Sequence, residues 1–312
     1  MMECLAAVRN LVGESPVWHP EHQSIYWTDI NGFRIYRFQI VDGRISNWVF
    51  HEPVCAISLT SDPDWLLAAV GPRLIFWQPA TDQRIPFVQP EPSWPSNRLN
   101  DGAADPNGNF WVGSMRNNVG SGGEHLEVSG NTGSLFRVSP RGEVTVWDTG
   151  FGIVNTIAWS PDSSNFWTAC SIRNVLYSYD YHLADSSISN RREFAAAASG
   201  ETTKPESAHN FATLRGVPDG SAVDLEGYLW NCRFGGSCIL RFSPQGIVQR
   251  LVEMPVSNIT NCVFGGPALD TLYVTTASIS TATSEPLAGG LFAIDQQTLG
   301  VKGLPPNRFI KI

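Results

Sequence analysis

Short stretches in which apolar and polar residues alternate recur along the whole chain. A period of two residues places alternate side chains on the two faces of a β-strand. In all-β proteins, turns separate such strands about every 8–12 positions. The clearest stretches cover residues 33–38, 73–77, 133–138, 175–180, 238–242 and 290–294. This pattern is typical of an all-β protein.

A second pattern precedes each alternating stretch. A turn leads into an apolar strand that carries a large anchor residue, as in Asp105-Pro-Asn-Gly before Trp111 and Asp224-Leu-Glu-Gly before Trp230. Successive anchors are 40 to 63 residues apart, at Tyr26, Leu66, Trp111, Trp167, Trp230 and Tyr273. A repeat of about 40–50 residues with several short strands is typical of propeller blades. The sequence therefore predicts a six-bladed β-propeller in which residues 1–312 form a single domain.

Polar residues keep a constant distance ahead of these anchors. Glu14, Asn155 and Asn261 lie 12 residues before theirs, and Asn100 and Asp219 lie 11 before theirs. The second repeat has Cys55 at this position. Because the first strand of a propeller blade lines the central channel, we expect these side chains to converge at one point on the axis.

Each of these residues alone has a plainer interpretation. Glu14 fits an exposed loop charge, Asn155 fits the end of a strand, and the Asp-Gly pairs at 101–102 and 219–220 are common turn sequences. Their shared phase changes this, because converging buried carboxylates and amide oxygens repel or stay unsatisfied without a cation. The sequence thus predicts a metal in the central channel. Oxygen donors suit Ca²⁺, Mg²⁺ or Mn²⁺, and two carboxylates leave positions open for Lewis-acid catalysis.

Composition excludes several partners. The net charge is −8 and no run of Lys or Arg occurs, so we expect no nucleic acid, whose phosphates need a basic face. The first residues lack the layout of a signal peptide, and no apolar run is long enough to span a membrane. Six cysteines without a Cys-x-x-Cys pair argue against a disulfide framework. We expect a cytoplasmic protein, monomeric or a small homo-oligomer.

Five motifs follow one another along the chain. They are residues 13–18 (Gly-Glu-Ser-Pro-Val-Trp), 98–102 (Arg-Leu-Asn-Asp-Gly), 155–162 (Asn-Thr-Ile-Ala-Trp-Ser-Pro-Asp), 218–220 (Pro-Asp-Gly) and 286–290 (Pro-Leu-Ala-Gly-Gly). In this order they resemble the regucalcin/gluconolactonase family of sugar lactonases, which are six-bladed propellers with one divalent ion in the channel. The resemblance implies that Glu14, Asn155 and Asp219 bind the metal. It also implies that Asn100 contacts metal-bound water or substrate and that Arg98 binds sugar hydroxyls.

The chain departs from the family pattern at several points. Thr156 stands where a glycine usually follows the second ligand, and Cys170 replaces an aspartate. Some relatives carry an acidic substrate contact after the methionine of the third blade, whereas Met115 is followed here by Arg116. The Gly/Ser/Asn-rich loop 116–132 is expected to be a lid or rim, or a plain hairpin loop. The insertion 195–213, with His209, is expected at the surface, and the other five histidines receive no role.

The resemblance implies metal-dependent hydrolysis of a sugar lactone to its aldonic acid. Calcium is the first choice of ion, with Mg, Mn, Zn or Fe as alternatives. Asp219 or Asp101 would be the general base, and the sequence does not separate them. Two other functions remain open: a non-catalytic metal- and sugar-binding propeller, and a broader metal-dependent esterase or organophosphate hydrolase.

Overall fold

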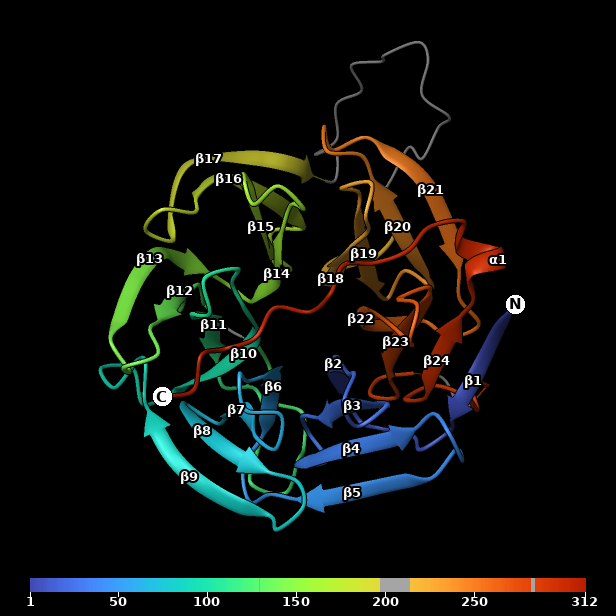
Figure 1. The fold of residues 1–312 in the computed structure, drawn as a ribbon, viewed down its shortest axis with the longest axis horizontal. Coiled ribbons are helices and arrows are strands. Elements are labelled where there is room, and N and C mark those ends of the chain that lie inside the picture. The colour runs from blue at the N-terminus through green and yellow to red at the C-terminus, as the bar shows by residue number, and fades with distance from the viewer. Residues whose placement is uncertain (129, 197–213, 282–283) are drawn as a thin grey trace.

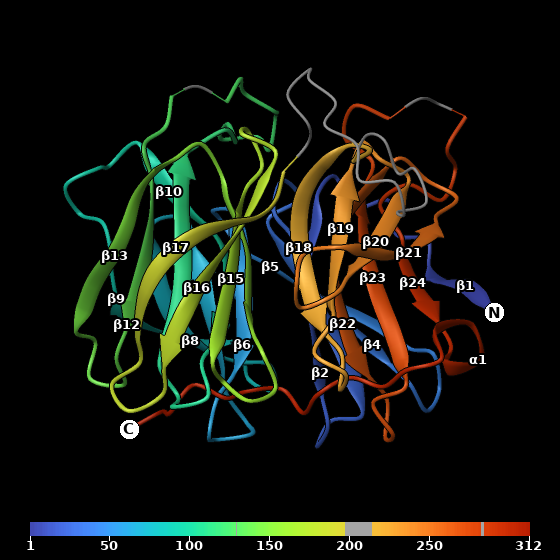
Figure 2. The ribbon, with the colours of Figure 1, turned by 90° about the horizontal axis from the view of Figure 1, so that it is seen from above.

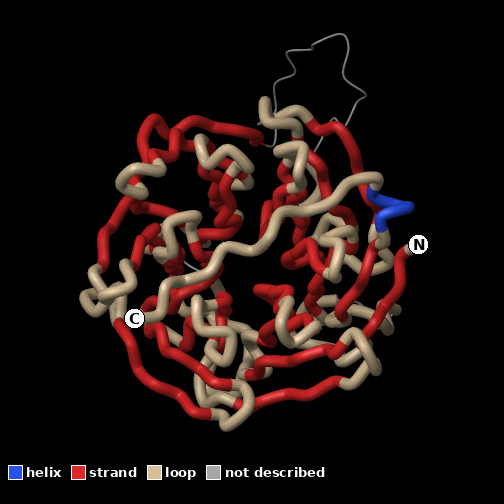
Figure 3. Tube along the Cα trace, in the orientation of Figure 1, coloured by secondary structure: helices blue, strands red, loops and turns tan. Residues whose placement is uncertain are grey.

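In the computed structural model, residues 1–128, 130–196, 214–281 and 284–312 are described, and they form six antiparallel four-stranded sheets around a central axis (Figure 1). Strands dominate the trace in Figure 3, beside the short helix α1 (Gln296–Leu299). The predicted six-bladed β-propeller is confirmed. No helix in the described part of the chain is long and apolar enough to cross a membrane.

The six blades follow the chain in order, each running from the axis outward. Blades 1 to 3 are β2–β5 (Gly13–His19, Ser24–Asp29, Arg34–Gln39, Ile45–Val49), β6–β9 (Val54–Leu59, Leu66–Val70, Arg73–Gln78, Gln83–Val88) and β10–β13 (Asn97–Ala104, Phe110–Arg116, Gly133–Val138, Val144–Phe151). Blades 4 and 5 are β14–β17 (Val154–Trp159, Asn165–Cys170, Val175–His182, Ser187–Ala196) and β18–β21 (Val217–Val223, Leu229–Phe234, Cys238–Phe242, Val248–Glu253). Blade 6 contains β22–β24 (Asn258–Gly265, Thr271–Ala277, Leu291–Ile294) and β1 (Met2–Ala6).

The predicted anchors all lie on the second strand of a blade. All six are at most 4% exposed, because this strand is covered by a neighbouring blade on each face. The turns before them explain the Asp-to-Trp spacing of two repeats. Asp224 accepts the backbone N–H groups of Glu226 and Tyr228 at 3.0 Å and the Trp230 indole N–H at 2.8 Å. One carboxylate therefore fixes both the turn and the anchor, and Asp105 does the same for Trp111.

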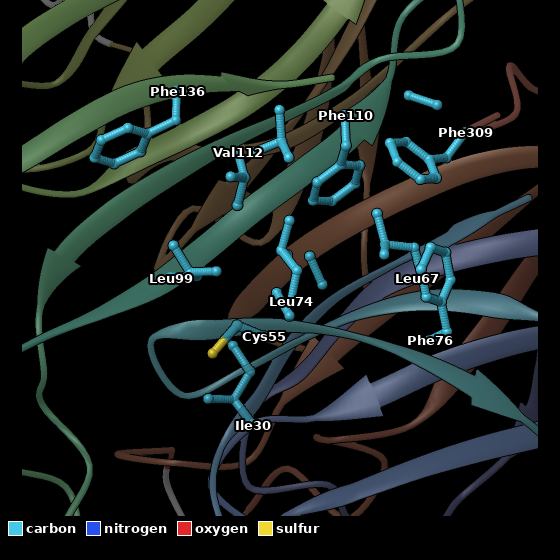
Figure 4. Packing of buried hydrophobic residues seen from close by; sticks show 14 of the residues in the cluster. Ile30, Cys55, Leu67, Leu74, Phe76, Leu99, Phe110, Val112, Phe136 and Phe309 are labelled. Atoms are coloured by element: carbon cyan, nitrogen blue, oxygen red, sulfur yellow. The ribbon is translucent and has the colours of Figure 1, made fainter. Parts of the chain in front are cut away.

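The hydrophobic core lies in layers between blades rather than in one central mass, since the axis is lined by polar side chains. Figure 4 shows the layer between blades 2 and 3, where Leu67 and Leu74 face Phe110 and Val112. Phe309, from the C-terminal segment, packs into the same layer and is fully buried. Adjacent blades are thus held together mainly by burial of apolar surface.

Both ends of the chain close the ring, a feature that the sequence patterns did not predict. Strand β1 pairs with β24 and supplies the outer strand of blade 6, with Met2 opposite Ile294. The C-terminal segment crosses the face opposite the 117–132 loop, as Figure 2 shows from the side. Its backbone bonds blade 5 through Lys302 and blade 2 through Phe309. All six cysteines are free thiols, as expected.

We predict that Asp224→Ala lowers the free energy of unfolding by about 3–5 kcal/mol, because the change removes a fully buried carboxylate that pairs with the Arg241 guanidinium and accepts the Trp230 indole N–H. Arg241 Nη2 lies 2.7 Å from Asp224, which is 0% exposed. Glu226→Ala is the matched control, since Glu226 pairs with the same guanidinium at 2.6 Å but is 59% exposed. It should cost at most about 1 kcal/mol. Equal losses in urea unfolding would contradict the assignment of Asp224 as the fixed point of the turn.

Candidate metal centre and substrate pocket

The innermost strands β2, β6, β10, β14, β18 and β22 stand closest to the axis (Figure 1). Each carries a break in its pairing register at the predicted site position, including Glu14–Val17 in blade 1 and Pro218–Ser221 in blade 5. A β-bulge turns side chains away from the regular pleat and is frequent beside active sites. The constant spacing of the site residues ahead of their anchors thus corresponds to a bulge that recurs in every blade.

A cavity of about 370 Å³ opens above these bulges. Five of the residues that the sequence singled out line it together: Glu14, Arg98, Asn100, Asn155 and Asp219. They come from blades 1, 3, 4 and 5, and each is at most 8% exposed. The structure therefore brings the predicted metal ligands and substrate contacts to one place.

Glu14 and Asp219 face each other in the channel. Glu14 accepts the Ser15 N–H at 2.7 Å and the Asn261 Nδ2–H at 2.9 Å. Burial, followed by the charge of Asp101, raises the pKa of Glu14 to about 7. Burial and the charge of Glu14 also raise the pKa of Asp219 well above its usual range. Without a cation, the folded protein therefore favours a protonated carboxyl in this pair.

Asn155 is held by hydrogen bonds on both sides. Its Oδ1 accepts the Asn100 Nδ2–H at 2.8 Å, and its Nδ2 donates to Ser171 Oγ at 2.8 Å. Ser171 in turn donates to the Pro218 carbonyl at 2.7 Å, next to Asp219. Because a carboxamide oxygen has two lone pairs, the Asn155 Oδ1 can still accept a second interaction.

Arg98 is fixed by the protein to a greater extent than the sequence suggested. It donates to Asn100 Oδ1 at 2.7 Å, to the Leu99 carbonyl at 2.9 Å and twice to Asn118 Oδ1, at 2.8 and 3.1 Å. These bonds use four of the five N–H groups of the guanidinium. Arg98 thus positions two carboxamides, and one of its Nη2–H groups has no hydrogen-bond acceptor among the described residues.

The backbone at Thr156 has a conformation that favours glycine, which is the residue that the family pattern has at this position. Its φ is 59°, in the left-handed region that β-branched residues rarely adopt. The hydroxyl gives the residue a compensating role, because it donates to the Asp219 carbonyl at 2.5 Å and lies 2.8 Å from Ser221 Oγ. Blade 4 is thereby tied to the backbone of Asp219.

Two in-phase residues, Asn261 and Cys55, are not among the described residues that line this cavity, and neither is the candidate base Asp101. Asp101 and Asn261 line a second cavity of about 460 Å³, which lies toward residues 304–307 at the opposite end of the channel. Cys55 packs into the apolar layer of Figure 4, with its thiol 3.7 Å from Arg98 Nη1. Asn261 nevertheless donates to Glu14 at 2.9 Å and so stays in contact with the predicted ligands, whereas Cys55 is the in-phase side chain that packs into an apolar layer instead. Asp101, which lines the second cavity, becomes the weaker candidate for the base.

The loop between β11 and β12 contributes to the rim of the cavity. Asn118, His125 and Val128 line it, and Asn31 of blade 1 donates to the Gly123 carbonyl at 2.8 Å. The loop thus forms part of the rim, as one of the two expectations had it, and it brings His125 to the cavity, a histidine to which the sequence pattern assigned no role. The insertion 197–213 with His209 lies outside the described residues.

Other site residues escaped sequence reasoning. Asn118, Ser171 and Thr156 hold the predicted residues in place, and only Thr156 stood out, as a departure from the family. Arg233 is a fully buried guanidinium whose charge opposes the raised pKa of Asp219. It lies three residues after the anchor Trp230, at a position that is uncharged in four of the other blades.

The donor set fits a hard divalent cation. The described residues contain no group of three or more His, Cys, Asp or Glu side chains placed for a metal ion, so a site here needs the carboxamide of Asn155. Two facing carboxylates and an oriented amide oxygen are the oxygen donors that Ca²⁺ and Mg²⁺ prefer. Burial and neighbouring carboxylates raise the pKa values of Glu14 and Asp219, and a bound cation would offset both effects.

Fold and site together define a β-propeller with an acidic, amide-rich pocket in its channel. The family model described as "SMP-30/Gluconolactonase/LRE-like region" matches residues 12–278. Regucalcin from Gallus gallus is 30% identical over 99% of this chain and 98% of its own length. L-arabinolactonase from Azospirillum brasilense is 29% identical over 95% and 92%. A solved structure of a luciferin-regenerating enzyme has 28% identity and a TM-score of 0.87, covering 100% and 99%.

The chain belongs to the SMP-30/gluconolactonase/LRE-like family. The resemblance inferred from its motifs is thereby confirmed.

We predict that Asp219→Asn stabilises the metal-free protein at pH 8 by about 1–2 kcal/mol and has little effect at pH 4. A raised pKa means that the folded state holds a proton that the unfolded state releases. The stability linked to Glu14 therefore falls as the pH rises from 4.5 to about 7. The variant removes one charge and provides an N–H for Glu14.

The measurement is urea unfolding in chelator, followed by tryptophan fluorescence at both pH values. Asp42→Asn, at an exposed turn, is the control and should change nothing. A loss of stability of Asp219→Asn at pH 8 would refute the repulsion inferred from the buried carboxylates.

Proposed function

We propose that this protein hydrolyses the ester bond of sugar lactones in a reaction that depends on a divalent cation. The observation that carries the proposal is the cavity in which Glu14, Asn155 and Asp219 converge beneath the Arg98 guanidinium. Relatives over nearly the full chain that are named L-arabinolactonase and pentonolactonase support the same reaction class. The cation is proposed to be calcium, with Mg, Mn, Zn or Fe as alternatives.

Glu14, Asn155 and Asp219 would hold the cation. A divalent ion at this point supplies polarisation of the lactone carbonyl and a lowered pKa for a water molecule. Asn100 fixes the orientation of the Asn155 carboxamide by donating to its oxygen at 2.8 Å. The Thr156 hydroxyl holds the Asp219 backbone. The chain thus fixes its donors before a substrate arrives.

Asp219 is proposed as the general base. It lines the substrate cavity and is almost completely buried, so its carboxylate lies where the attacking water would be held. Asp101 shares the burial but lies toward the other cavity and accepts the Gly102 N–H at 2.9 Å. The proton of the attacking water would therefore pass to Asp219.

Arg98 is proposed to bind the substrate through its remaining Nη2–H. The guanidinium is held in one orientation by Asn118 and Asn100, so this donor points into the cavity without loss of side-chain freedom on binding. Asn100 then acts mainly by positioning Arg98 and Asn155.

Acid release from a panel of aldonolactones, measured with a pH indicator, tests the proposal. Chelator-treated protein should be inactive and should regain activity on addition of one of Ca²⁺, Mg²⁺, Mn²⁺ or Zn²⁺. Asp219→Asn and Glu14→Gln should lower kcat/KM about 10²–10⁴-fold, the range for loss of a group that acts on the reacting proton. Asp101→Asn is the matched control and should lose less than about tenfold.

Three outcomes contradict the proposal in different ways. Tight cation binding without turnover would indicate a metal- and sugar-binding propeller. Faster hydrolysis of aryl esters or organophosphates than of lactones would indicate the broader hydrolase. A larger loss for Asp101→Asn than for Asp219→Asn would exchange the roles of the two aspartates.

A further inference from the structure

The rim of the 370 Å³ cavity has a polar side and an apolar side. Blades 1 and 3 and the loop 117–132 contribute most of its polar groups, Asn31, Arg98, Asn118 and His125, beside the apolar Val12, Ile30, Met115 and Val128. Blades 4, 5 and 6 contribute five apolar side chains, which we call the apolar wall: Ile153, Ile172, Val217, Phe234 and Ile279. The wall lies opposite the polar groups, because blades 4 to 6 make up the other half of the ring (Figure 1).

The apolar wall is not part of the hydrophobic core. Among the described residues, none of its five members belongs to the packed layers between blades, whereas Ile30 and Val12 on the polar side do pack into one. Every member lies next to a strand end at the same mouth of the channel: Val217 begins β18 and Phe234 ends β19. Ile172 is 54% exposed, and the other four are only partly buried. These side chains therefore gain apolar contact only when something fills the cavity.

The two carboxamide oxygens beside Arg98 are already hydrogen-bonded. Asn118 Oδ1 already accepts two hydrogen bonds from Arg98, and Asn100 Oδ1 accepts one from the same guanidinium. The carboxylate of Glu124 in the loop is turned to the Gly122 N–H at 2.9 Å and does not line the cavity. A terminal hydroxyl that faced the apolar wall would lose its hydrogen bonds to water without gaining a partner there, which costs binding energy in a buried pocket.

We propose that the substrate is a lactone that carries an apolar end group, such as the terminal methyl of a 6-deoxyaldonolactone. This inference rests on the proposed lactonase activity and specifies its substrate class. The ring carbonyl lies at Glu14, Asn155 and Asp219, the ring hydroxyls face Arg98 and His125, and the end group contacts Val217 and Phe234. A terminal CH₂OH in the same place faces the apolar wall and loses its hydrogen bonds to water.

Two pairs of lactones that differ only at the terminal carbon test the proposal. They are L-rhamnono-1,4-lactone against L-mannono-1,4-lactone, and L-fucono-1,4-lactone against L-galactono-1,4-lactone. For the pair whose ring stereochemistry fits, kcat/KM of the deoxy compound should exceed that of its partner by about 10- to 100-fold, the effect of one methyl or hydroxyl in such a pocket. Binding of the same four compounds to the metal-loaded protein is measured by calorimetry.

Variants of the apolar wall locate the effect. Val217→Thr keeps the shape and adds one hydroxyl, so the preference should shrink about threefold to tenfold, and Phe234→Ser should reduce it further. Val146→Thr makes the same exchange on β13, where the side chain is 54% exposed, and should leave the preference unchanged. Melting temperatures of all three variants show whether they fold.

The experiment distinguishes a failure of the proposed substrate class from a failure of the proposed lactonase activity. Equal or faster hydrolysis of the hydroxylated partner in both pairs overturns the apolar end group and leaves the lactonase intact. Absence of turnover on every lactone overturns the proposed reaction. In that case the calorimetry decides, and tighter binding of the hydroxylated compounds overturns the apolar end group as well.

Discussion

The site depends on one electrostatic constraint: Glu14 and Asp219 are buried opposite each other in the channel with raised pKa values. Two carboxylates in such surroundings repel each other and lack their hydration. They therefore lower the stability of the folded state unless a cation binds between them. Arg98 and Arg233 are also buried nearby, but both guanidinium groups are occupied with carbonyl and carboxamide oxygens. The arrangement is thus destabilising by itself, and the divalent ion that we propose would remove the repulsion.

Hydrogen bonds between blades keep these carboxylates in place. Asn100 of blade 3 donates to the Val154 carbonyl of blade 4, and Thr156 of blade 4 donates to the Asp219 carbonyl of blade 5. Thr260 of blade 6 donates to the Gly13 carbonyl of blade 1 at 2.5 Å. Because the bulged innermost strands leave backbone groups without ladder partners, these side chains satisfy them and connect the blades at the site.

The sequence predicted the blades and the site positions well because both repeat. The anchors Tyr26 to Tyr273 recur with the turn before them, and distance from an anchor sufficed to find Glu14, Asn155 and Asp219. It did not show that Asp101 and Asn261 turn toward the other end of the channel. That direction depends on the bulge, where Gly220 leaves room for Asn261: a Cβ on Gly220 would lie 2.2 Å from Asn261 Oδ1. Contacts between distant segments, such as β1 with β24 and Phe309 with blade 2, have no local signal at all.

The most direct test of the account is a crystal structure of the protein grown with Mn²⁺, with diffraction data collected at the manganese absorption edge. The account predicts one strong anomalous peak in the channel, within coordination distance of carboxylate oxygens of Glu14 and Asp219 and of the Asn155 carboxamide oxygen. Mn–O distances are expected near those of other hard divalent ions, about 2.0–2.6 Å. A peak beside Asp101 and Asn261 instead, or no peak in the channel, would contradict the central claim that the facing carboxylates exist to hold a cation.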